Sequence, residues 1–480
     1  MMRHRSISLL LALGVTGIWL LLLLPLPLRA RARAGTWYVA PGGNNANSCI
    51  TPEQPCATPN GALNQAGFVA GDSVLVAAGR YTNTQEENAV VWLAQDAHLS
   101  GGWDPAFTMQ NRETVLDGEN EQVVVVVLNG VTATMERFTM GNSGALARVR
   151  TCKQQGQCGD PSPYLTFTTP TPLAFHSASF DNQQGGLTGI HNRGVLTLIN
   201  SEFLGLYGGA GIWNEGTMTV TGSMVSGVYP TGIANYGQLT LQGSGVWGNF
   251  GGCAGIGNGG RLTVIESAVI YNDVRSGASG GGICNTGEAV LVNSTVSMNG
   301  ALGSSSNPEA GRGGGIYNIT GTLALYNSTV TDNSAQHGGG IYNTSDGVVT
   351  LQNTLLASNN ATFFGGEGDD CSGRVHSRGY NLIGVTTDCI IEAGSGDILD
   401  RGEGPFFPLI GTTLPYNPLP RPSAAVDGGN PAGCLDHEGR LLTVDQRGVP
   451  RQGRCDIGSY EYNEQHDPFF YLFLPIISSQ

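Results

Sequence analysis

The stretch 187–362 repeats one short pattern seven times. Each copy reads Gly-Ile-x-Asn, then a glycine, an alternating apolar run, and Ser or Thr beside an apolar residue. The isoleucines of the seven copies are Ile190, Ile212, Ile233, Ile256, Ile283, Ile316 and Ile341. Successive isoleucines lie 22, 21, 23, 27, 33 and 25 residues apart. A period in the twenties predicts a solenoid, in which each copy is one coil that stacks on the next.

The apolar residues within each copy recur at every second position, as in Leu196 and Leu198. This alternation is typical of β-strands and not of helices, and glycines separate the runs where sharp bends are needed. Three short strands and three turns per copy predict an all-β fold, a single-stranded right-handed parallel β-helix. The handedness follows that of parallel crossover connections in general.

The asparagine two residues after each isoleucine points to the same side of its strand, because side chains alternate. Stacked coils then place asparagine over asparagine, and we expect each amide to hydrogen-bond to the next, as stacked asparagines do in cross-β structures. The predicted ladder consists of Asn192, Asn214, Asn235, Asn258, Asn285, Asn318 and Asn343.

The residue between each isoleucine and asparagine points the opposite way, towards solvent. These residues are His191, Trp213, Ala234, Gly257, Cys284, Tyr317 and Tyr342. Trp213, Tyr317 and Tyr342 therefore predict exposed aromatic side chains on one face, which suit sugar rings or protein partners. The alternative is that inserts such as 299–311 fold over these rings.

Composition excludes several classes of partner. The chain has 480 residues, a formal net charge of −14 and 12 % charged residues, and Lys153 is its single lysine. An acidic chain without basic clusters argues against nucleic acid as a partner. A solenoid of this length grows by adding coils, so we expect a monomer. We predict no cofactor.

The N-terminal residues 1–34 read as a secretory signal. A basic start at Arg3 and Arg5 precedes an apolar run, and Ala32-Arg33-Ala34 supplies the small residues of a cleavage site. The alternative is a retained membrane anchor, because the run is about 20 residues long. Either reading places the protein outside the cell or on its surface.

Ten cysteines fit an exported protein and fall into close pairs. The candidate disulfides are Cys49 with Cys56, Cys152 with Cys158, Cys371 with Cys389, and Cys434 with Cys455. Cys253 and Cys284 remain, and their pairing is left open. Zinc is the rival reading, but no Cys-x-x-Cys pair exists and no histidine lies at ligand spacing, so we predict no metal site.

The remaining segments differ in character. Residues 35–82 predict an N-terminal cap and first coil, with a short helix over 59 to 68 that covers the end of the solenoid. Residues 83–186 predict irregular coils with a Cys- and Pro-rich loop at 148–172. Residues 363–462 form a loop-rich C-terminal region, and 463–480 a short apolar tail, which is either a final strand or a sorting tag.

Two stretches carry family resemblances. The opening Trp37-Tyr38-Val39, the step Cys56-Ala57-Thr58 and the strand from Gly71 resemble the N-terminus of the pectate-lyase-like superfamily of right-handed β-helix proteins. The repeats, as in Gly314-Gly315-Ile316, resemble the Gly-Gly-x-Ile repeats of polymorphic outer-membrane proteins. That second likeness implies a surface protein or adhesin.

The C-terminal region resembles the choice-of-anchor Q domain. The motifs in order are Asp370-Cys371-Ser372-Gly373, Gly379-Tyr380-Asn381-Leu382-Ile383-Gly384, Ala425-Val426-Asp427-Gly428-Gly429-Asn430-Pro431, Asp445-Gln446-Arg447-Gly448 and Cys455-Asp456-Ile457-Gly458. The resemblance implies secretion, surface display and association with the cell envelope. Residues 401–420 depart from it, because they lack the usual Asn-Gly-Gly-rich segment.

We predict no catalytic residues. Asp369 and Asp370 are adjacent and point to opposite sides of a strand, so they suit a loop better than an acid–base pair. The charged residues Asp445, Arg447, Asp456 and Glu461 predict a buried ionic network that holds the C-terminal region. His191 and His337 are expected on the surface.

The preferred hypothesis is a secreted or cell-surface, non-catalytic β-helix that adheres to polysaccharide or to a surface protein. The alternative is a polysaccharide lyase or glycoside hydrolase of the pectate-lyase-like superfamily, with its site on the 190–343 face. A passive envelope spacer is the third reading.

Overall fold

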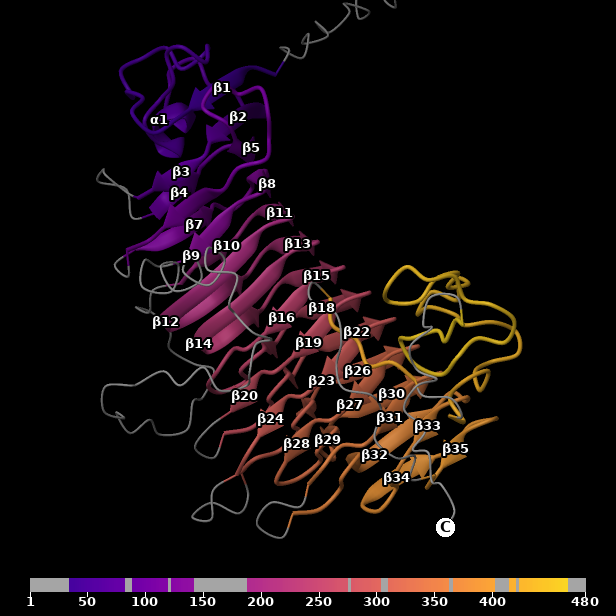
Figure 1. Ribbon diagram of the computed structural model, residues 1–480. Helices are drawn as coiled ribbons and strands as arrows, with labels where there is room; N and C mark the ends of the chain where they lie inside the picture. Colours follow the sequence, from indigo (N-terminus) through magenta and orange to yellow (C-terminus); the bar gives the residue numbers. More distant parts are fainter. Residues whose placement is uncertain are drawn as a thin grey trace, which may run out of the picture. The chain divides into compact units, whose positions relative to one another are not determined.

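Short strands stack coil upon coil in the order of the sequence (Figure 1). The computed structural model describes residues 34–82, 89–119, 122–141, 188–274, 278–303, 310–361, 366–401, 414–419 and 423–464. Neighbouring coils pair in parallel and in register, with Ile190 opposite Ile212 and Asn192 opposite Asn214. The predicted right-handed parallel β-helix is confirmed as the fold class. The signal, the loop 148–172 with Cys152 and Cys158, and most of the tail lie outside the described residues.

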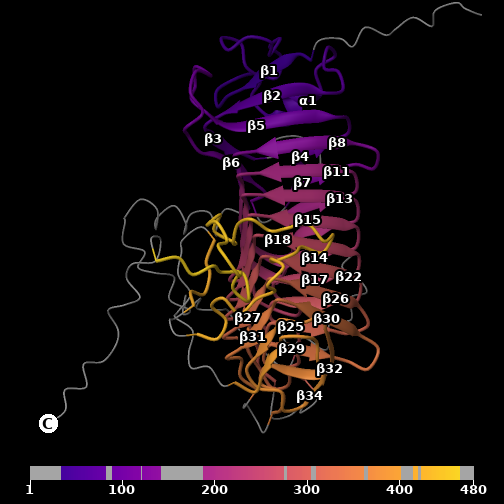
Figure 2. The same cartoon turned by 90° about the vertical axis from the view of Figure 1, so that its right-hand side faces the viewer.

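The first stack of strands forms one continuous face of the column, seen as parallel rungs in Figure 2. Its members are β1 (Thr36–Val39), β2 (Asp72–Ala77), β5 (Ala97–Trp103), β8 (Thr132–Glu136), β11 (Val195–Ile199), β13 (Thr217–Thr221), β15 (Gln238–Gln242), β18 (Arg261–Ile265), β22 (Glu288–Val292), β26 (Thr322–Tyr326), β30 (Val348–Gln352), β32 (Cys371–Ser377) and β34 (Cys389–Glu392).

The second stack carries the Ile-x-Asn motif. Its members are β4 (Ala89–Leu93), β7 (Val123–Val127), β10 (Ile190–Asn192), β12 (Glu202–Asn214), β14 (Met224–Asn235), β17 (Ile256–Asn258), β21 (Ile283–Asn285), β25 (Ile316–Asn318) and β29 (Ile341–Asn343).

The third stack closes each coil, and β12 and β14 belong to it as well as to the second. Its other members are β3 (Gly79–Tyr81), β6 (Thr114–Asp117), β9 (Thr139–Gly141), β16 (Gly245–Trp247), β19 (Ala268–Ile270), β23 (Thr295–Ser297), β27 (Thr329–Thr331), β31 (Leu355–Ala357), β33 (Leu382–Ile383) and β35 (Ile398–Leu399).

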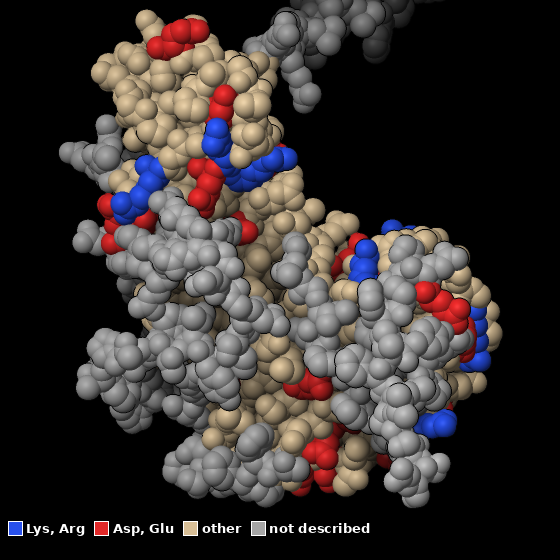
Figure 3. All heavy atoms as spheres, in the orientation of Figure 1, with Lys and Arg blue, Asp and Glu red and all other residues tan. Residues whose placement is uncertain are grey.

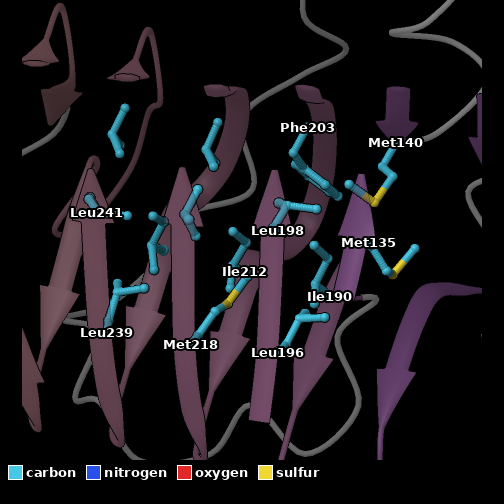
Figure 4. Close-up of a cluster of buried hydrophobic side chains, with 14 of the residues drawn as sticks. Met135, Met140, Ile190, Leu196, Leu198, Phe203, Ile212, Met218, Leu239 and Leu241 are labelled. Atoms are coloured by element: carbon cyan, nitrogen blue, oxygen red, sulfur yellow. The ribbon is translucent and has the colours of Figure 1, made fainter. Parts of the chain in front are cut away.

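The core of the column consists of aliphatic side chains from all three stacks. Leu196 and Leu198 of β11 point towards Ile190 and Phe203, and the same arrangement recurs in the next coil (Figure 4). Each of these four side chains is fully buried. In first-stack strands such as β11, β13 and β18, the alternation in the sequence therefore places every second side chain in the core, as expected for strands with a single buried face.

One left-handed residue per coil makes the bend between the first and third stacks. Asn and Gly dominate this row because they tolerate positive φ at the smallest steric cost. We call these residues the αL row: Asn200, Gly222, Gly243, Glu266, Asn293, Asn327 and Asn353, with φ of 47°, 57°, 54°, 49°, 53°, 49° and 52°.

The asparagines of the second stack hydrogen-bond from coil to coil inside the column. Asn235 Nδ2 donates to Asn258 Oδ1 at 2.7 Å, and Asn258 Nδ2 donates to Asn285 Oδ1 at 2.8 Å. The row continues in both directions and ends where Asn343 Nδ2 donates to the backbone oxygen of Arg374. These buried amides satisfy one another's hydrogen-bonding groups, and none of them carries a charge.

A second asparagine ladder follows the third stack, and the sequence analysis did not predict it. Its members are Asn249, Asn272, Asn299, Asn333 and Asn359, each donating to the next at 2.9 Å. Asn359 then donates to Asp370 Oδ1 at 2.9 Å. A carboxylate therefore ends this ladder as a pure acceptor.

The predicted insert at 299–311 and the equivalent insert at 272–280 in the preceding coil both begin as regular structure. Their first residues join a third coil to form a small parallel sheet of β20 (Asp273–Val274), β24 (Gly300–Ala301) and β28 (Ser334–Ala335). Each insert thus begins with a short strand that pairs with the equivalent strand of the neighbouring coil. Some of the residues that follow lie outside the described ranges.

The N-terminal cap contains a single helical turn. Helix α1 (Pro59–Leu63) begins at Thr58, whose Oγ1 accepts a hydrogen bond from Gly61 N at 3.0 Å. The predicted helix over 59 to 68 was too long, because the chain turns at Asn64. Leu63 and Phe68 are buried as expected, but Ala66 is exposed.

Residues 423–464, which we call the C-terminal lobe, pack against the side of the later coils (Figure 1). The lobe binds three consecutive members of the αL row. Asn293 Nδ2 donates to Val444 O at 3.0 Å, Asn327 Nδ2 to Leu435 O at 2.6 Å, and Asn353 Nδ2 to Asp456 O at 2.9 Å. Ile457 and Tyr460 add an apolar contact with Leu355 and Leu382.

Four disulfides are present among the described residues. Three are those predicted, Cys49–Cys56, Cys371–Cys389 and Cys434–Cys455, and the fourth joins Cys253 to Cys284. Disulfides of this number are typical of proteins in an oxidising, extracytoplasmic environment. Within the described ranges, no helix has the length and apolar character needed to cross a membrane.

Candidate functional site

The outward residues of the second stack divide into two aromatic groups. Trp213 and Tyr236 pack with ring centroids 4.9 Å apart, and Tyr317 and Tyr342 with centroids 5.7 Å apart. All four rings retain exposed surface. The outward direction of Trp213, Tyr317 and Tyr342 follows from the register, because each stands between a buried isoleucine and a buried asparagine. Tyr236 directly follows β14 and is 37 % exposed.

The stretch between the two aromatic groups is covered. Ala234 and Cys284 are 6 % and 1 % exposed, and Gly257 is also buried. Cys284 is tied to Cys253, so the loop that carries Cys253 lies over this part of the face. Trp213 and the pair of Tyr317 and Tyr342, predicted to lie on one face, therefore belong to two separate groups.

The first site, which we call the Trp213 site, combines an aromatic pair with an ionic cluster. It comprises His191, Arg193, Trp213, Glu215 and Tyr236. His191 Nε2 lies 3.2 Å and Arg193 Nε 3.1 Å from Glu215 Oε2. All five residues lie on the outer surface of three consecutive coils, at or just after the strands β10, β12 and β14.

The ionic cluster keeps Glu215 charged. Partial burial opposes its ionisation, but hydrogen bonds from Trp213, His191 and Arg193 outweigh that penalty and hold the pKa of Glu215 below its usual range. An anchored carboxylate beside a partly exposed indole can accept hydrogen bonds from hydroxyl groups of a ligand that stacks on the ring.

The second site, which we call the Tyr317 site, has a basic partner. The Arg312 guanidinium lies 5.2 Å from the centroid of the Tyr342 ring, within cation–π range. His337 Nδ1 lies 4.0 Å from Glu367 Oε1 nearby along the same edge of the column. This site therefore presents two tyrosine rings with a cation beside them.

The acidic residues considered in the sequence serve the structure. Asp370 Oδ1 accepts from Asn359 and its Oδ2 accepts from Val385 N at 2.7 Å. Burial raises the pKa of Asp370 to about 6. Asp369 Oδ1 accepts from Ala361 N at 2.8 Å. The two carboxylates thus hold a turn and do not face one common point.

The charged residues of the C-terminal lobe form a buried network. Arg451 Nη1 pairs with Glu461 at 3.1 Å, and Arg447 pairs with Asp445 at 2.7 Å and stacks 3.8 Å from the Tyr460 centroid. Burial, and then the neighbouring Glu461, raise the pKa of Asp456 to about 7. The network holds the lobe together.

Glu215 and Tyr236 were not singled out from the sequence, although a signal for them exists. Each directly follows a ladder asparagine, Asn214 or Asn235, and Arg193 holds the same position after Asn192. Aligning the repeats position by position would have placed Arg193 and Glu215 on adjacent coils.

No group of three or more potential metal-ligating His, Cys, Asp or Glu residues occurs in the described part of the chain. On the face in Figure 3, charged residues form small groups among uncharged surface.

The comparisons with known proteins give structures of similar fold. No family model matches the chain, and no curated protein matches its sequence. Pectate lyase Pel9A has a TM-score of 0.43 at 14 % identity, covering 90 % of this chain and 97 % of its own. XylC, solved with xylose, has a TM-score of 0.42 at 9 % identity, covering 89 % and 98 %.

A glycoside hydrolase is also among the structural neighbours. The GH136 lacto-N-biosidase from Eubacterium ramulus has a TM-score of 0.38 at 12 % identity, covering 76 % of this chain and 68 % of its own. These similarities concern the fold.

Proposed function

We propose that this protein binds polysaccharide on the outward face of its second stack, with the Trp213 site as the principal contact. The observation that carries the proposal is the pairing of the partly exposed Trp213 and the exposed Tyr236 with an anchored carboxylate, Glu215. Sugar rings present apolar faces and peripheral hydroxyls, so they need a flat ring and fixed polar groups side by side. The Tyr317 site is a second contact of the same kind.

Binding to a panel of neutral and acidic polysaccharides by the exported form of the chain tests this proposal. We expect Trp213→Ala to weaken binding about tenfold, because a ring stacked on a ligand contributes on the order of 1 kcal/mol or more. The matched control is Trp103→Ala, whose partly buried indole lies near the N-terminal cap. Equal binding by wild type and Trp213→Ala would remove the Trp213 site from the function.

A second candidate function is cleavage of the bound polysaccharide by a lyase or glycoside hydrolase. The observation in its favour is the contact of His191 with Glu215 on the ligand-facing surface, which brings two titratable side chains within 3.2 Å. Such groups can transfer protons when a sugar ring lies beside them. Formation of new reducing ends or unsaturated products, lost in Glu215→Gln, would establish cleavage. Binding without products would favour the non-catalytic function.

Adhesion and surface display remain predictions. The N-terminal signal, the repeats and the resemblance of the C-terminal region to the choice-of-anchor Q domain support them. Fractionation of cells that express the full chain, and a form ending at residue 462, would test them. Release of the shortened form into the medium is the expected result if the tail directs attachment.

A further inference from the structure

The N-terminal cap contains a buried carboxylate without a charged partner. Asp72 begins strand β2 and is 1 % exposed. Its Oδ2 accepts hydrogen bonds from Trp37 Nε1 at 2.8 Å and from Val69 N at 3.0 Å, and its Oδ1 accepts one from Gly35 N at 2.6 Å. Within the described ranges, no basic side chain pairs with Asp72. A fully buried aspartate normally has such a partner.

This carboxylate stays ionised despite its burial. Burial opposes the charge, but the hydrogen bonds from Trp37, Val69 and Gly35 outweigh that penalty and hold the pKa of Asp72 below its usual range. The three donors satisfy lone pairs of the carboxylate, but none of them neutralises its charge. A cation that reached Oδ1 would replace a neutral hydrogen bond with a stronger, charge-assisted one.

Gly35 brings its backbone nitrogen closer to this carboxylate than another residue would allow. Its backbone oxygen accepts a hydrogen bond from Ser73 N at 3.0 Å, which holds Gly35 beside the start of β2. A Cβ added to Gly35 would lie 3.0 Å from Asp72 Oδ2 and 3.2 Å from Oδ1 and from the carboxyl carbon. These distances are shorter than ordinary van der Waals contacts, so a larger residue would push the nitrogen away.

The peptide bond before Gly35 is the one at which the sequence predicts removal of the signal. Ala32-Arg33-Ala34 supplies the small residues that a signal peptidase needs, and Ala34 is exposed. Hydrolysis of this bond adds one water, whose hydroxyl joins the carbonyl carbon of Ala34. The nitrogen of Gly35 takes the remaining proton of that water and the proton that the new carboxyl group loses. The product is an ammonium on a nitrogen that already lies 2.6 Å from Asp72 Oδ1.

We propose that Gly35 is the first residue of the exported protein and that its α-ammonium forms an ion pair with Asp72, which fastens the N-terminal cap. The pair fixes the start of β1, where Trp37 packs against Phe68 with ring centroids 5.7 Å apart. Before cleavage the nitrogen of Gly35 is a neutral amide with one hydrogen. Removal of residues 1–34 therefore stabilises the cap, and this effect is independent of polysaccharide binding.

The α-amine can be followed with little interference, because Lys153 is the only lysine of the chain. Mass spectrometry of the exported protein should give Gly35 as its first residue. An amine-reactive acetylating reagent then labels the α-amine and Lys153, and the Lys153 signal serves to normalise the reagent. We expect labelling of the α-amine at pH 7 to be about tenfold slower in wild type than in Asp72→Asn, because the ion pair keeps the amine protonated.

A second variant separates the charge from the hydrogen bonds. One serine inserted between Ala34 and Gly35 keeps Asp72 and its three donors, but moves the ammonium one residue away. We expect fast labelling of its α-amine and about tenfold more frequent opening of the cap, measured by hydrogen exchange of peptides covering 35–82. Glu53→Gln, which removes an exposed carboxylate of the same cap, is the matched control and should behave like wild type.

Each outcome decides for or against the ion pair. Faster labelling in both variants, from a wild type that begins at Gly35, supports it. An exported protein that begins at another residue, or that retains residues 1–34, would overturn it. So would equal labelling of the α-amine in wild type, Asp72→Asn and the serine-inserted form. If Asp72→Asn fails to fold, the serine insertion alone decides.

Discussion

The column and the C-terminal lobe bury polar groups in opposite ways. Inside the column, rows of asparagine amides hydrogen-bond to one another and carry no charge, as in the contact of Asn235 with Asn258. Inside the lobe, Arg451 and Glu461 form an ion pair whose side chains are 3 % and 4 % exposed. The comparison shows that neutral ladders suit a structure that repeats, because every member donates and accepts alike. A lobe without repeats must balance each buried charge with a specific partner.

The largest expected effect comes from breaking the lobe network. Arg451→Leu leaves the Glu461 carboxylate buried without its ion-pair partner and removes the cation near Asp456, while Asp445 keeps its pair with Arg447; it should destabilise the lobe by about 3 to 5 kcal/mol. Hydrogen exchange of peptides covering 423–464 would measure the local free energy of opening. We expect the peptides of β11 to β18 to keep their protection. Loss of protection across the whole column would contradict the separation of the two regions.

A smaller effect is expected from interrupting a ladder. Asn258→Ala removes the acceptor of Asn235 Nδ2 and the donor to Asn285 Oδ1, so two buried amides lose a partner. The cost should be about 2 to 3 kcal/mol. Because each coil contacts only its neighbours, the loss of exchange protection should centre on β14 to β21. The matched control is Asn64→Ala, an exposed asparagine at the end of helix α1.

The two regions should also differ in their response to pH. Burial raises the pKa of Asp456 to about 7 and that of Asp370 to about 6, from an ordinary value of 3.8. Between the ordinary pKa of 3.8 and these raised values, the two carboxyl groups are protonated in the folded protein and ionised in the unfolded chain. Stabilisation from these groups is complete below about pH 4 and disappears as the pH rises through 6 and 7. We expect the lobe to open more readily at pH 8 than at pH 5, by about 1 to 3 kcal/mol.

Substitution of each residue in turn distinguishes the contributions of Asp456 and Asp370 to the pH dependence. Asp456→Asn should flatten the pH dependence of exchange in the lobe, and Asp370→Asn should flatten it only around β32 and the end of the second ladder. The coils from β11 to β17, held by amides, should show no such dependence once the intrinsic exchange rate is corrected for pH. The coil around β27 should show it, because burial also raises the pKa of Asp332 to about 6. A lobe that grows more stable from pH 5 to pH 8 would oppose this account.

The smallest effect is expected from an exposed ion pair on the first stack. Arg261 Nη2 lies 2.8 Å from Glu288 Oε2, but the two side chains are 62 % and 47 % exposed. Solvent and salt screen such a pair, so Arg261→Ala should change the free energy of unfolding by less than about 1 kcal/mol. Urea unfolding at low and high salt would check this. A loss comparable to that of Asn258→Ala would mean that surface charges stabilise the column as much as its ladders do.

The regular part of the fold could be predicted from the sequence because the repeat itself carries the information. Ile190 and Asn192 recur with fixed spacing, so register and side-chain direction follow from alternation alone. The second ladder escaped prediction because Asn249 and Asn272 stand outside the Gly-Ile-x-Asn motif, among loop residues where asparagine is common. The buried ionic network of the lobe was predicted from its charged residues. The contact of the lobe with the column was not, because it joins residues far apart in the sequence, as when Asn293 binds Val444.

The candidate site could be predicted only in part, for a similar reason. The outward direction of Trp213 follows from its strand. The cover over Cys284 depends on a disulfide to Cys253, whose position no periodicity fixes.

The attachment of the lobe to the αL row limits where coils can be added to or removed from the column. Asn293, Asn327 and Asn353 hydrogen-bond to the lobe from three successive coils. In the three preceding coils the same position of the αL row is occupied by Glu266, Gly243 and Gly222. Whole coils can therefore be duplicated or lost on the N-terminal side of Ile256 while the lobe keeps its seat. A coil inserted between Asn293 and Asn353 would instead separate the asparagines that hydrogen-bond to the lobe. Length is thus free to vary at one end of the molecule and constrained at the other.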